Sequence, residues 1–551
     1  MKIPVVWLDG QRGYWDHTLL LKAFDGELSN VPNQYEYEHY DSPYGGVLGC
    51  VLVVCGGGGE GKEKQVQDLI KVMRWVLVIV VSDECNLFKW QDLKLHDRAK
   101  IWVQTPDLKS EQKPDRYLPV GLTPHTRNLH YDKSRGWFFA GQKNTPERVA
   151  VIGALEKREF VADDGLLIST GGFSQGYEAH EYNEVMNGAK FIPCPRGVVS
   201  PDSFRLCESL EVGAVPIATS DIVDGKNFYE AIFGEPVPFP VFEDLALNVD
   251  SFIDDNKDNF KALSNKCRSW WGLQKRKLLT DLTDTVSELS GTEPPKQETD
   301  LTILIPTSPI ESHPSSYHID CVLDSIRLHP HLKNCEIIIM VDGIRDELKQ
   351  YTEAYETYVA SLLRRSENID NNLTVITFDV HTHQAGMTRE ALMLVRTENI
   401  LFVEHDTFLV HTHTYSDIRG ICNAITHRWD CNMVRLHYDV SIHPEHLHLM
   451  LDTEPQMVEG VPMIRSQQWS QRPHIASTAF YKAMLEEHFA PDALTMLEDR
   501  NHGLLQSAHA NGEWDQWGHW IYAEGFPDKM KYSGHSDARK SDSKFEDQFR
   551  W

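Results

Sequence analysis

Around the start of one expected helix, the first half of the chain places a cation, a hydroxyl, a second cation and a carboxylate. Arg196 follows the apolar run Ala189 to Cys194, and Ser203, Arg205 and Glu208 come soon after it. The free N–H groups and the dipole of a helix start can hold a diphosphate. Arg205 would add charge-assisted hydrogen bonds, and Glu208 would accept two ribose hydroxyls. On spacing alone, an ordinary ion pair between Arg205 and Glu208, at i and i+3 of a helix, accounts for the pattern equally well.

In the second half, two carboxylates stand one residue apart at the end of an apolar run. The segment ILFVEHDTFLV, from Ile400 to Val410, places Glu404 and Asp406 after a strand-like stretch. Alternation along a strand points both side chains to the same side. Carboxylate oxygens in such a pair suit Mg²⁺ or Mn²⁺, and the ion would neutralise charge that develops on a diphosphate leaving group. Taken alone, the pair fits a solvated loop better than a metal site.

A glycine-rich stretch, VVCGGGGEGKEK from Val53 to Lys64, follows another apolar run. The spacing from Gly56 to Lys62 matches the phosphate-binding loop of NTPases. That loop needs Ser or Thr after the lysine to hold Mg²⁺, and this chain has Glu63 there. A carboxylate at this point would also repel phosphates. We therefore favour a tight turn that lines a cleft, with an NTPase loop as the alternative.

Composition bounds the class of protein. A chain of 551 residues with 41% hydrophobic residues can bury two to four cores. The formal net charge of −27 disfavours a broad surface that tracks nucleic-acid phosphates, although it leaves room for a local basic groove. The ten cysteines form no C-x-x-C pair, so neither a zinc ribbon nor a disulfide framework is indicated. The N-terminus lacks a signal-peptide core, and the longest apolar run, Trp75 to Val81, is too short to span a bilayer. We expect a cytoplasmic protein without a membrane anchor.

Apolar runs alternate with helical patterns through most of the chain, which predicts an α/β fold with parallel sheets covered on both faces. Two series of such runs precede the polar, Pro-containing segment Ser290 to Asp300. They predict two Rossmann-like lobes, at residues 1–130 and 131–290, with a ligand bound between them. We expect a linker at 291–300. Leu301 starts a further α/β series, which predicts a single-sheet domain over residues 301–551.

The segment from Phe191 to Asp221 resembles the exostosin-like glycosyltransferases through its C-P-R-G turn and the pattern S-F-R-L-x-E-S-L-E-x-G-A-V-P-I. That family has the two-lobed GT-B fold, and there this segment grips the nucleotide of the sugar donor. The resemblance implies donor-binding roles for Arg196, Ser203, Arg205 and Glu208. The family typically inverts configuration without a metal, so no metal cofactor is expected in the first half. The first lobe would face the acceptor, and the sequence does not identify its catalytic base.

The second half resembles the GT-A glycosyltransferases in the order of its motifs. These are LTILIPTSP, IIIMVDG with Asp342, HQAGMTREALML with Arg389, and FVEHD. The resemblance implies that Asp342 and Arg389 bind the nucleotide-sugar donor. It also implies that Glu404 and Asp406 stand where the family has its metal-binding D-x-D motif, with Glu404 in place of the first Asp.

Two later segments of the second half extend this resemblance. MLEDRNHG, from Met496, resembles the motif whose Asp is the general base on the acceptor hydroxyl. Asp499 would take that role, and Glu498 is the alternative. GHSDARKSD, from Gly534, resembles an H-x-D-G-R segment whose His is a third metal ligand, here His535, although Ala538 replaces the glycine.

Two other segments leave alternatives open. HPEHLH, from His443 to His448, has clustered histidines without the H-E-x-x-H order, so a metal site there is the less favoured interpretation. WSQRPHIAS, from Trp469 to Ser477, fits an acceptor-sugar platform and equally fits ordinary packing.

The sequence therefore predicts a bifunctional glycosyltransferase, a GT-B domain joined to a GT-A domain, in an arrangement similar to that of the animal exostosins. Its partners would be nucleotide-sugar donors, with Mn²⁺ or Mg²⁺ in the second domain only, and two successive transfers would extend one product. A bacterial or viral surface glycan, or a protein glycan, is the favoured acceptor, and hydroxymethylated bases of phage DNA are the alternative. A carbohydrate-binding protein with one inactive transferase domain is a rival from another class.

Overall fold

The structure is a computed structural model, and its chain forms two compact units, Met1–Lys296 and Gln297–Trp551. It describes residues 2–8, 13–29, 33–41, 48–56, 61–82, 87–104, 110–162, 164–172, 176–197, 200–223, 225–293, 301–368, 372–410 and 417–536. The boundary between the units falls within the expected linker at 291–300. Across the described residues, no helix combines the length and the apolar character that crossing a bilayer requires.

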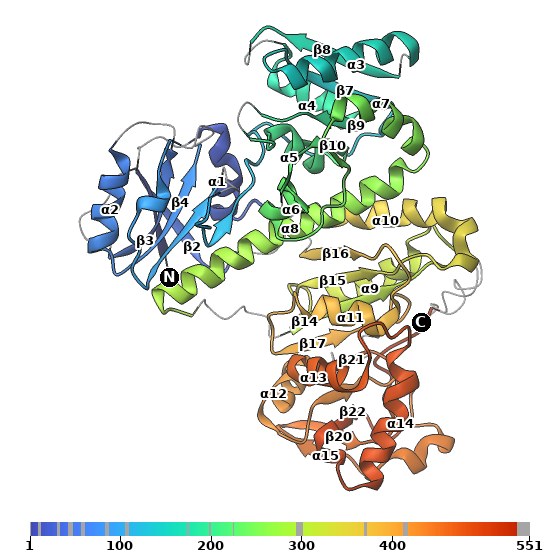
Figure 1. Cartoon of the computed structure of the whole chain (residues 1–551). Coiled ribbons are helices and arrows are strands. Elements are labelled where there is room, and N and C mark those ends of the chain that lie inside the picture. Colours follow the sequence, from blue (N-terminus) through green and yellow to red (C-terminus); the bar gives the residue numbers. More distant parts are fainter. Residues whose placement is uncertain are drawn as a thin grey trace. The chain divides into compact units, whose positions relative to one another are not determined.

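The first unit begins with a parallel sheet whose central strands are buried apolar runs (Figure 1). Its strands lie in the order β2-β1-β3-β4-β5-β6. They are β1 (Lys2–Trp7), β2 (Glu36–Tyr40), β3 (Gly49–Cys55), β4 (Trp75–Val81), β5 (Ala99–Val103) and β6 (Arg116–Tyr117), and helices α1 (Thr18–Phe24) and α2 (Lys62–Val72) connect them. The polar edge strand β2 gave no apolar signal in the sequence, whereas the other long strands lie where the apolar runs predicted them.

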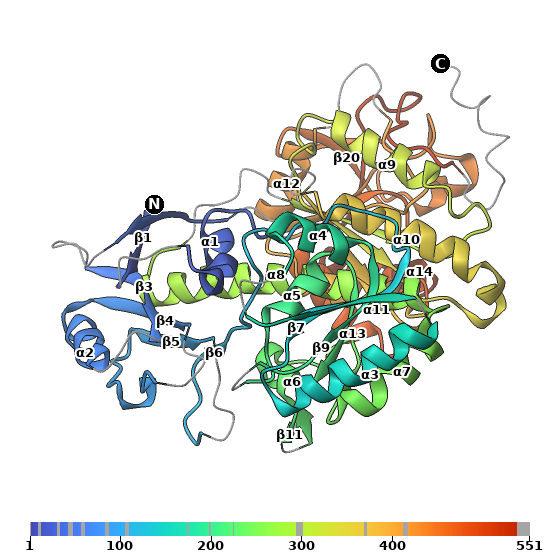
Figure 2. The same ribbon diagram turned by 90° about the horizontal axis from the view of Figure 1, so that it is seen from above.

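A second parallel sheet follows in the same unit, in the order β13-β10-β9-β7-β8. Its strands are β7 (Arg135–Gln142), β8 (Gly165–Thr170), β9 (Ala189–Cys194), β10 (Val215–Thr219) and β13 (Val241–Phe242). The connecting helices are α3 (Pro146–Ala162), α4 (Ala179–Asn187), α5 (Phe204–Glu211), α6 (Phe228–Phe233) and α7 (Leu245–Asn256), and β11 (Ile222–Val223) and β12 (Lys226–Asn227) form a small hairpin. Helices α3 and α7 lie side by side (Figure 2), joined by Arg158, whose Nη2 lies 3.1 Å from Asp254 Oδ1.

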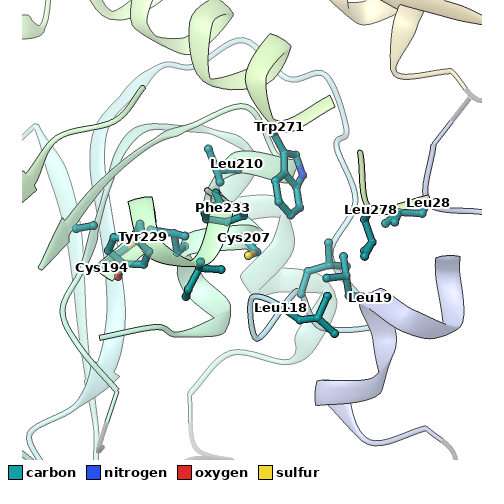
Figure 3. Close-up of a cluster of buried hydrophobic side chains, with 14 of the residues drawn as sticks. Leu19, Leu28, Leu118, Cys194, Cys207, Leu210, Tyr229, Phe233, Trp271 and Leu278 are labelled. Atoms are coloured by element: carbon teal, nitrogen blue, oxygen red, sulfur yellow. The ribbon is translucent and has the colours of Figure 1, made fainter. Parts of the chain in front are cut away.

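The long helix α8 (Phe260–Ser290) ties the two sheets of the first unit together. It packs against β4 in the first sheet and against α5 and β10 in the second. Its side chains belong to one continuous hydrophobic core, in which Trp271 lies beside Leu210 and Leu278 lies near Leu28 (Figure 3). The two Rossmann-like sheets therefore share a core.

The second unit holds one nine-stranded sheet, in the order β16-β15-β14-β17-β21-β18-β22-β20-β19. Its parallel part consists of β14 (Leu301–Thr307), β15 (Ile337–Val341), β16 (Leu373–Thr377) and β17 (Asn399–Phe402), as the apolar runs predicted. The mixed part consists of β18 (Met433–Arg435), β19 (Gln456–Val458), β20 (Val461–Arg465), β21 (His474–Ser477) and β22 (His519–Tyr522). The helices are α9 (Tyr317–Leu328), α10 (Thr352–Ser366), α11 (His383–Leu392), α12 (Ile418–His427), α13 (Thr478–His488), α14 (Leu497–Ala510) and α15 (Trp514–Trp517).

Candidate functional sites

A pocket of about 520 Å³ lies in the first unit, at the carboxyl ends of β7 and β8 and at the start of α5. In the second sheet the chain passes from β7 to β8 on one side and later returns to β9 on the other. The carboxyl edge at such a reversal of strand order is where open parallel sheets bind ligands. The residues that line the pocket are Trp15, Val120, Thr123, His125, Thr126, Ala140, Gly141, Gln142, Asn144, Arg148, Thr170, Gly176, Tyr177, Glu178, Ala179, Tyr182, Asn183, Gly197, Ser200, Asp202, Ser203, Phe204, Arg205 and Glu208.

Ser203 and Arg205 line this pocket, and each has a buried polar atom without a partner among the described residues. Ser203 is the N-cap of α5, but its Oγ makes no capping hydrogen bond. The guanidinium of Arg205 lies over the ring of Phe139, with Cζ 4.5 Å from the ring centroid, and Nη2 donates a hydrogen bond to the carbonyl of Ala140 while Nε has no partner. A Cβ on Gly141 would lie 3.1 Å from Arg205 Nη2, so glycine there allows the close approach. Buried polar atoms without partners mark a place where a ligand or water completes the hydrogen bonding.

Glu208 is buried in the pocket wall and accepts three hydroxyl hydrogen bonds. Thr123 Oγ1 and Thr126 Oγ1 donate to Oε1 at 2.8 and 3.1 Å, and Tyr182 Oη donates to Oε2 at 3.4 Å. Burial raises the pKa of the Tyr182 phenol, so it stays protonated and can act as this donor. If Glu208 binds the donor as expected, the hydroxyls of the ribose would take the place of some of these threonine and tyrosine hydroxyls as hydrogen-bond donors to its carboxylate.

Asp202 places a second buried carboxyl at the start of α5. Its two oxygens accept hydrogen bonds from Val120 N at 2.7 Å and from Ser203 N at 2.9 Å. Burial nevertheless raises the pKa of Asp202 to about 7, against these two donors, which lower it. Near neutral pH the carboxyl of Asp202 is therefore close to the midpoint of its titration. It lies beside the helix end that would hold an anion.

The structure places Arg196 outside the pocket wall. Its Nη2 lies 3.0 Å from Asp221 Oδ2, its Nε lies 3.8 Å from Glu147 Oε2, and it is not one of the lining residues. Arg148 lines the pocket instead and donates from Nε to the carbonyl oxygen of Arg196 at 3.1 Å. Arg148 lies in the first turn of α3, far along the chain from the donor motif, and the sequence gave no signal for it.

Only part of the glycine-rich loop is described, because residues 57–60 lie outside the described ranges. In the part that is described, Gly61 has φ of +97° and Lys62 Nζ donates to the Cys55 carbonyl at 2.8 Å. Glu63 Oε1 accepts a hydrogen bond from Lys89 N at 2.9 Å, which lowers the pKa of Glu63. The ammonium of Lys62 is thus bound to the carbonyl at the end of β3. The described loop residues do not line the pocket.

In the second unit, the chain brings Glu404, Asp406 and His535 into one neighbourhood. The two carboxylates follow β17, which lies next to β14 where the order of the parallel strands reverses. Residues 532–536 run alongside 406–410, with Gly534 N donating to the Phe408 carbonyl at 2.8 Å. This pairing places His535 beside the carboxylates, with its Nε2 3.2 Å from Asp406 Oδ2.

Glu404 is the second carboxylate of this site. Burial first and the charge of Asp406 second raise the pKa of Glu404 to about 7. Its Oε1 accepts a hydrogen bond from Gln384 Nε2 at 2.7 Å. Two carboxylates that repel each other's ionisation suit a divalent cation with oxygen ligands. Among the described residues, no three His, Cys, Asp or Glu side chains are arranged so that they could hold a metal ion unaided.

Helix α14 carries both candidate bases of the second unit in its first turn. Glu498 Oε2 accepts a hydrogen bond from Gln471 N at 3.2 Å, whereas Asp499 is exposed and has no hydrogen-bond or ion-pair partner among the described residues. Gln384 links this helix to the acidic pair, because its Oε1 accepts from Leu497 N at 3.5 Å. Asp499 is therefore the less engaged of the two carboxylates.

Asp342 and Arg389, the expected donor-binding pair, both serve local structure. Asp342 is buried and accepts hydrogen bonds from Thr382 N at 2.7 Å and from its neighbour Gly343 N at 2.9 Å, and His381 Nδ1 lies 2.7 Å from its Oδ2. Arg389 donates to four backbone carbonyls, at distances from 2.9 to 3.3 Å, just beyond and within the last turn of α13. Both side chains therefore already make local hydrogen bonds, and their donor-binding roles stay a prediction.

The two segments with open alternatives also have defined surroundings. Trp469 is 1% exposed and packs among Tyr481, Trp517 and His519, so this ring belongs to the core and not to a sugar platform. The histidines from His443 to His448 lie on and beside a short 3₁₀ helix. No three-ligand group includes them in the described part of the chain.

No family model matches the chain, and no curated protein does either. Solved structures with some similarity include S. aureus TarS, residues 1–349, at 16% identity and a TM-score of 0.27, over 43% of this chain and 60% of that one. The chain spans 36% of the longer S. aureus TarS structure. A mannosyltransferase from Pyrobaculum calidifontis, in complex with GDP-Man and Mn²⁺, matches at 13% identity and a TM-score of 0.24. The match covers 38% of this chain and 51% of that one. Glucosyl-3-phosphoglycerate synthase from Mycobacterium tuberculosis, with Mn²⁺ and UDP, matches at 14% identity and a TM-score of 0.25. The match covers 44% of this chain and 73% of that one. At such scores the similarity carries no argument, and function has to be inferred from the chain's own residues.

Proposed function

We propose that the chain is a glycosyltransferase that uses nucleotide-sugar donors and that the pocket of the first unit is a donor site. The observation that carries this proposal is the meeting of Ser203, Arg205 and Glu208 in one pocket at the strand-order reversal. Their unpartnered hydroxyl and guanidinium atoms would bind a diphosphate, and the buried carboxylate would bind ribose hydroxyls.

The start of α5 supplies the diphosphate subsite. Its free backbone N–H groups and its dipole favour an anion, and Arg205 and Arg148 add two guanidinium groups on the walls. In the transition state, negative charge grows on the departing diphosphate as the bond to the sugar breaks. Hydrogen-bond donors that are already in place around the diphosphate lower the activation barrier without reorganisation of solvent. The arrangement needs no metal ion in this unit.

We further propose that the second unit is another transferase, of the GT-A type. Glu404, Asp406 and His535 would hold Mn²⁺ or Mg²⁺ together with the diphosphate of a donor, which would supply the remaining oxygen ligands. The ion would neutralise charge on the leaving group, and Asp499 would accept the proton of the acceptor hydroxyl. Two such units would add successive sugars to one acceptor, a glycan in our preferred interpretation and a hydroxymethylated DNA base in the alternative.

The donor site can be tested by calorimetric titration of the whole chain with UDP, GDP, dTDP and CMP in EDTA. We expect one nucleotide to bind, and Arg205→Ala to weaken its binding at least tenfold, because a charge-assisted hydrogen bond is worth about 1.5–3 kcal/mol. Lys143→Ala is the matched control, since Lys143 lies beside the pocket but pairs outward with Glu156 at 2.7 Å. That variant should bind like the wild type.

Two results would contradict the donor site. Absence of binding for all four nucleotides would remove the proposal for the first unit. Equal affinity of wild type and Arg205→Ala would place the nucleotide somewhere other than this pocket.

A further inference from the structure

A strap of residues 118–129 is fastened to the second sheet's helices by hydrogen bonds to their polar side chains. Val120 N donates to Asp202, and Arg127 N donates to Asn183 Oδ1 at 3.0 Å. Further along, Leu129 N donates to Asn187 Oδ1 at 2.7 Å. Hydrogen bonds near both of its ends thus attach the strap beside the pocket, which several of its residues line.

His125 lies at the turn of this strap and lines the pocket. Its neighbours Thr123 and Thr126 both donate to the same oxygen of Glu208, which fixes the backbone on either side of the imidazole. The side chain itself is exposed and has no hydrogen-bond, ion-pair or ring partner among the described residues. A histidine held this way can reach a ligand without first breaking a contact.

The other groups of the pocket that could accept a proton are already engaged. Asp202 and Glu208 receive hydrogen bonds on both of their oxygens. Glu178 is the N-cap of α4 and forms a capping box with Glu181. Of the described lining residues, His125 is thus the one that carries an imidazole and whose ring nitrogens are both available.

We propose that His125 is the general base of the first unit, which accepts the proton of the acceptor hydroxyl. This inference rests on the proposed donor site. As the O–H bond breaks, the hydroxyl oxygen attacks the anomeric carbon of the donor sugar and forms the new glycosidic bond. The bond from that carbon to the diphosphate oxygen breaks, and its electron pair leaves with the nucleotide diphosphate. The proton then passes from the imidazolium to solvent, so atoms and charge balance.

The experiment measures hydrolysis of UDP-, GDP-, dTDP- and CMP-sugars by the whole chain in EDTA, where water replaces the acceptor. His125→Gln should bind the nucleotide within about twofold of wild type and hydrolyse the donor at least about 100-fold more slowly, the usual contribution of a positioned base. Imidazole added to His125→Ala should restore part of the rate, which a purely structural role would not allow.

His180→Gln is the matched control, because His180 is exposed in the first turn of α4 and does not line the pocket. It should hydrolyse the donor like the wild type. The proposal is contradicted if His125→Gln keeps the wild-type rate. It is also contradicted if that variant loses nucleotide affinity with an unchanged turnover number, which would make His125 a donor contact, or if the wild type binds nucleotide without turnover. Failure of the wild type to bind any nucleotide would instead contradict the donor site itself.

Discussion

At the scale of single residues, the pocket of the first unit contains two guanidiniums and three carboxyls, those of Glu178, Asp202 and Glu208. Arg148 and Arg205 face a space that also contains Asp202 and Glu208. The hydroxyl donors around Glu208 are compatible with its charge, whereas Asp202 sits at the helix end where a diphosphate would lie. The ionisation of Asp202 is therefore the variable that should control donor binding.

This makes donor affinity in the first unit dependent on pH. Burial places the pKa of Asp202 at about 7, and an anion beside it favours the protonated form. Affinity for a nucleotide sugar, measured by calorimetry in EDTA from pH 5.5 to 8.5, should fall as the pH rises through 7. The loss should be about 1–3 kcal/mol, the scale for two like charges a few ångströms apart near a protein surface. Asp202→Asn should remove the slope, and an equal slope in that variant would contradict the assignment.

The same group also affects stability, and the sign follows from proton uptake. The folded chain binds more protons than the unfolded chain between the ordinary pKa of 3.8 and the folded value of about 7. The contribution of Asp202 to the free energy of unfolding therefore decreases as the pH rises across that window. Thermal unfolding of wild type and Asp202→Asn should show this difference in slope.

At the residue scale, three of the four residues predicted from one short segment line the same pocket, and the fourth, Arg196, does not. Ser203, Arg205 and Glu208 lie within six residues at the start of one helix, where their spacing and the family resemblance together suggested a common site. Arg148 and His125 come from other elements and reach the pocket only through the fold. Trp469 shows the converse, because an aromatic residue in a polar segment can be fully buried.

At the scale of elements, α8 packs against both sheets of the first unit, which share one core. Its residues Trp271, Leu278 and Leu282 belong to a core that includes strands of both sheets. Arg116 and Asp281 add an ion pair between β6 and the same helix. A pocket that takes lining residues from both parts of this unit depends on that shared support.

Truncation of a buried side chain on α8 should therefore loosen both sheets together. Leu282 is 1% exposed, and Leu282→Ala should cost about 2–5 kcal/mol of unfolding free energy through the cavity it leaves. Hydrogen exchange should show lower protection in peptides from both β4 and β10. Leu247→Ala, at a position that is 79% exposed, should change neither the free energy of unfolding nor the hydrogen-exchange protection. Loss of protection in only one sheet would mean that the lobes unfold separately.

The apolar runs predicted the buried parallel strands well, and the reason is physical. Strands covered on both faces, such as β4 and β14, must be apolar throughout and so stand out in the sequence. The edge strand β2 is polar and partly exposed, and β18 and β19 have only three residues each, too few to leave such a pattern. The mixed half of the second sheet was consequently absent from the sequence-based expectation.

At the scale of the whole molecule, the chain contains two compact units, each with its own candidate site at a reversal of strand order. The first site relies on guanidiniums and a helix start. The second relies on an acidic pair in which burial and mutual repulsion raise the pKa of Glu404. The two sites should therefore respond differently to metal ions.

Asp406→Ala tests this separation. Removal of one carboxylate should abolish donor hydrolysis that requires Mn²⁺ and should leave the hydrolysis that persists in EDTA. Measurement of both rates on the same preparation provides the internal control. Survival of the Mn²⁺-dependent rate would show that the acidic pair has only a structural role.

The most direct test of the central claim is donor hydrolysis by the wild-type chain across UDP-, GDP-, dTDP- and CMP-sugars, each with Mn²⁺ or with EDTA. We predict that one donor is hydrolysed in EDTA and that one is hydrolysed only with the metal. That result would identify both nucleotides and both kinds of site. Absence of hydrolysis for every donor under both conditions would contradict the account and would favour a protein that binds carbohydrate without transferring it.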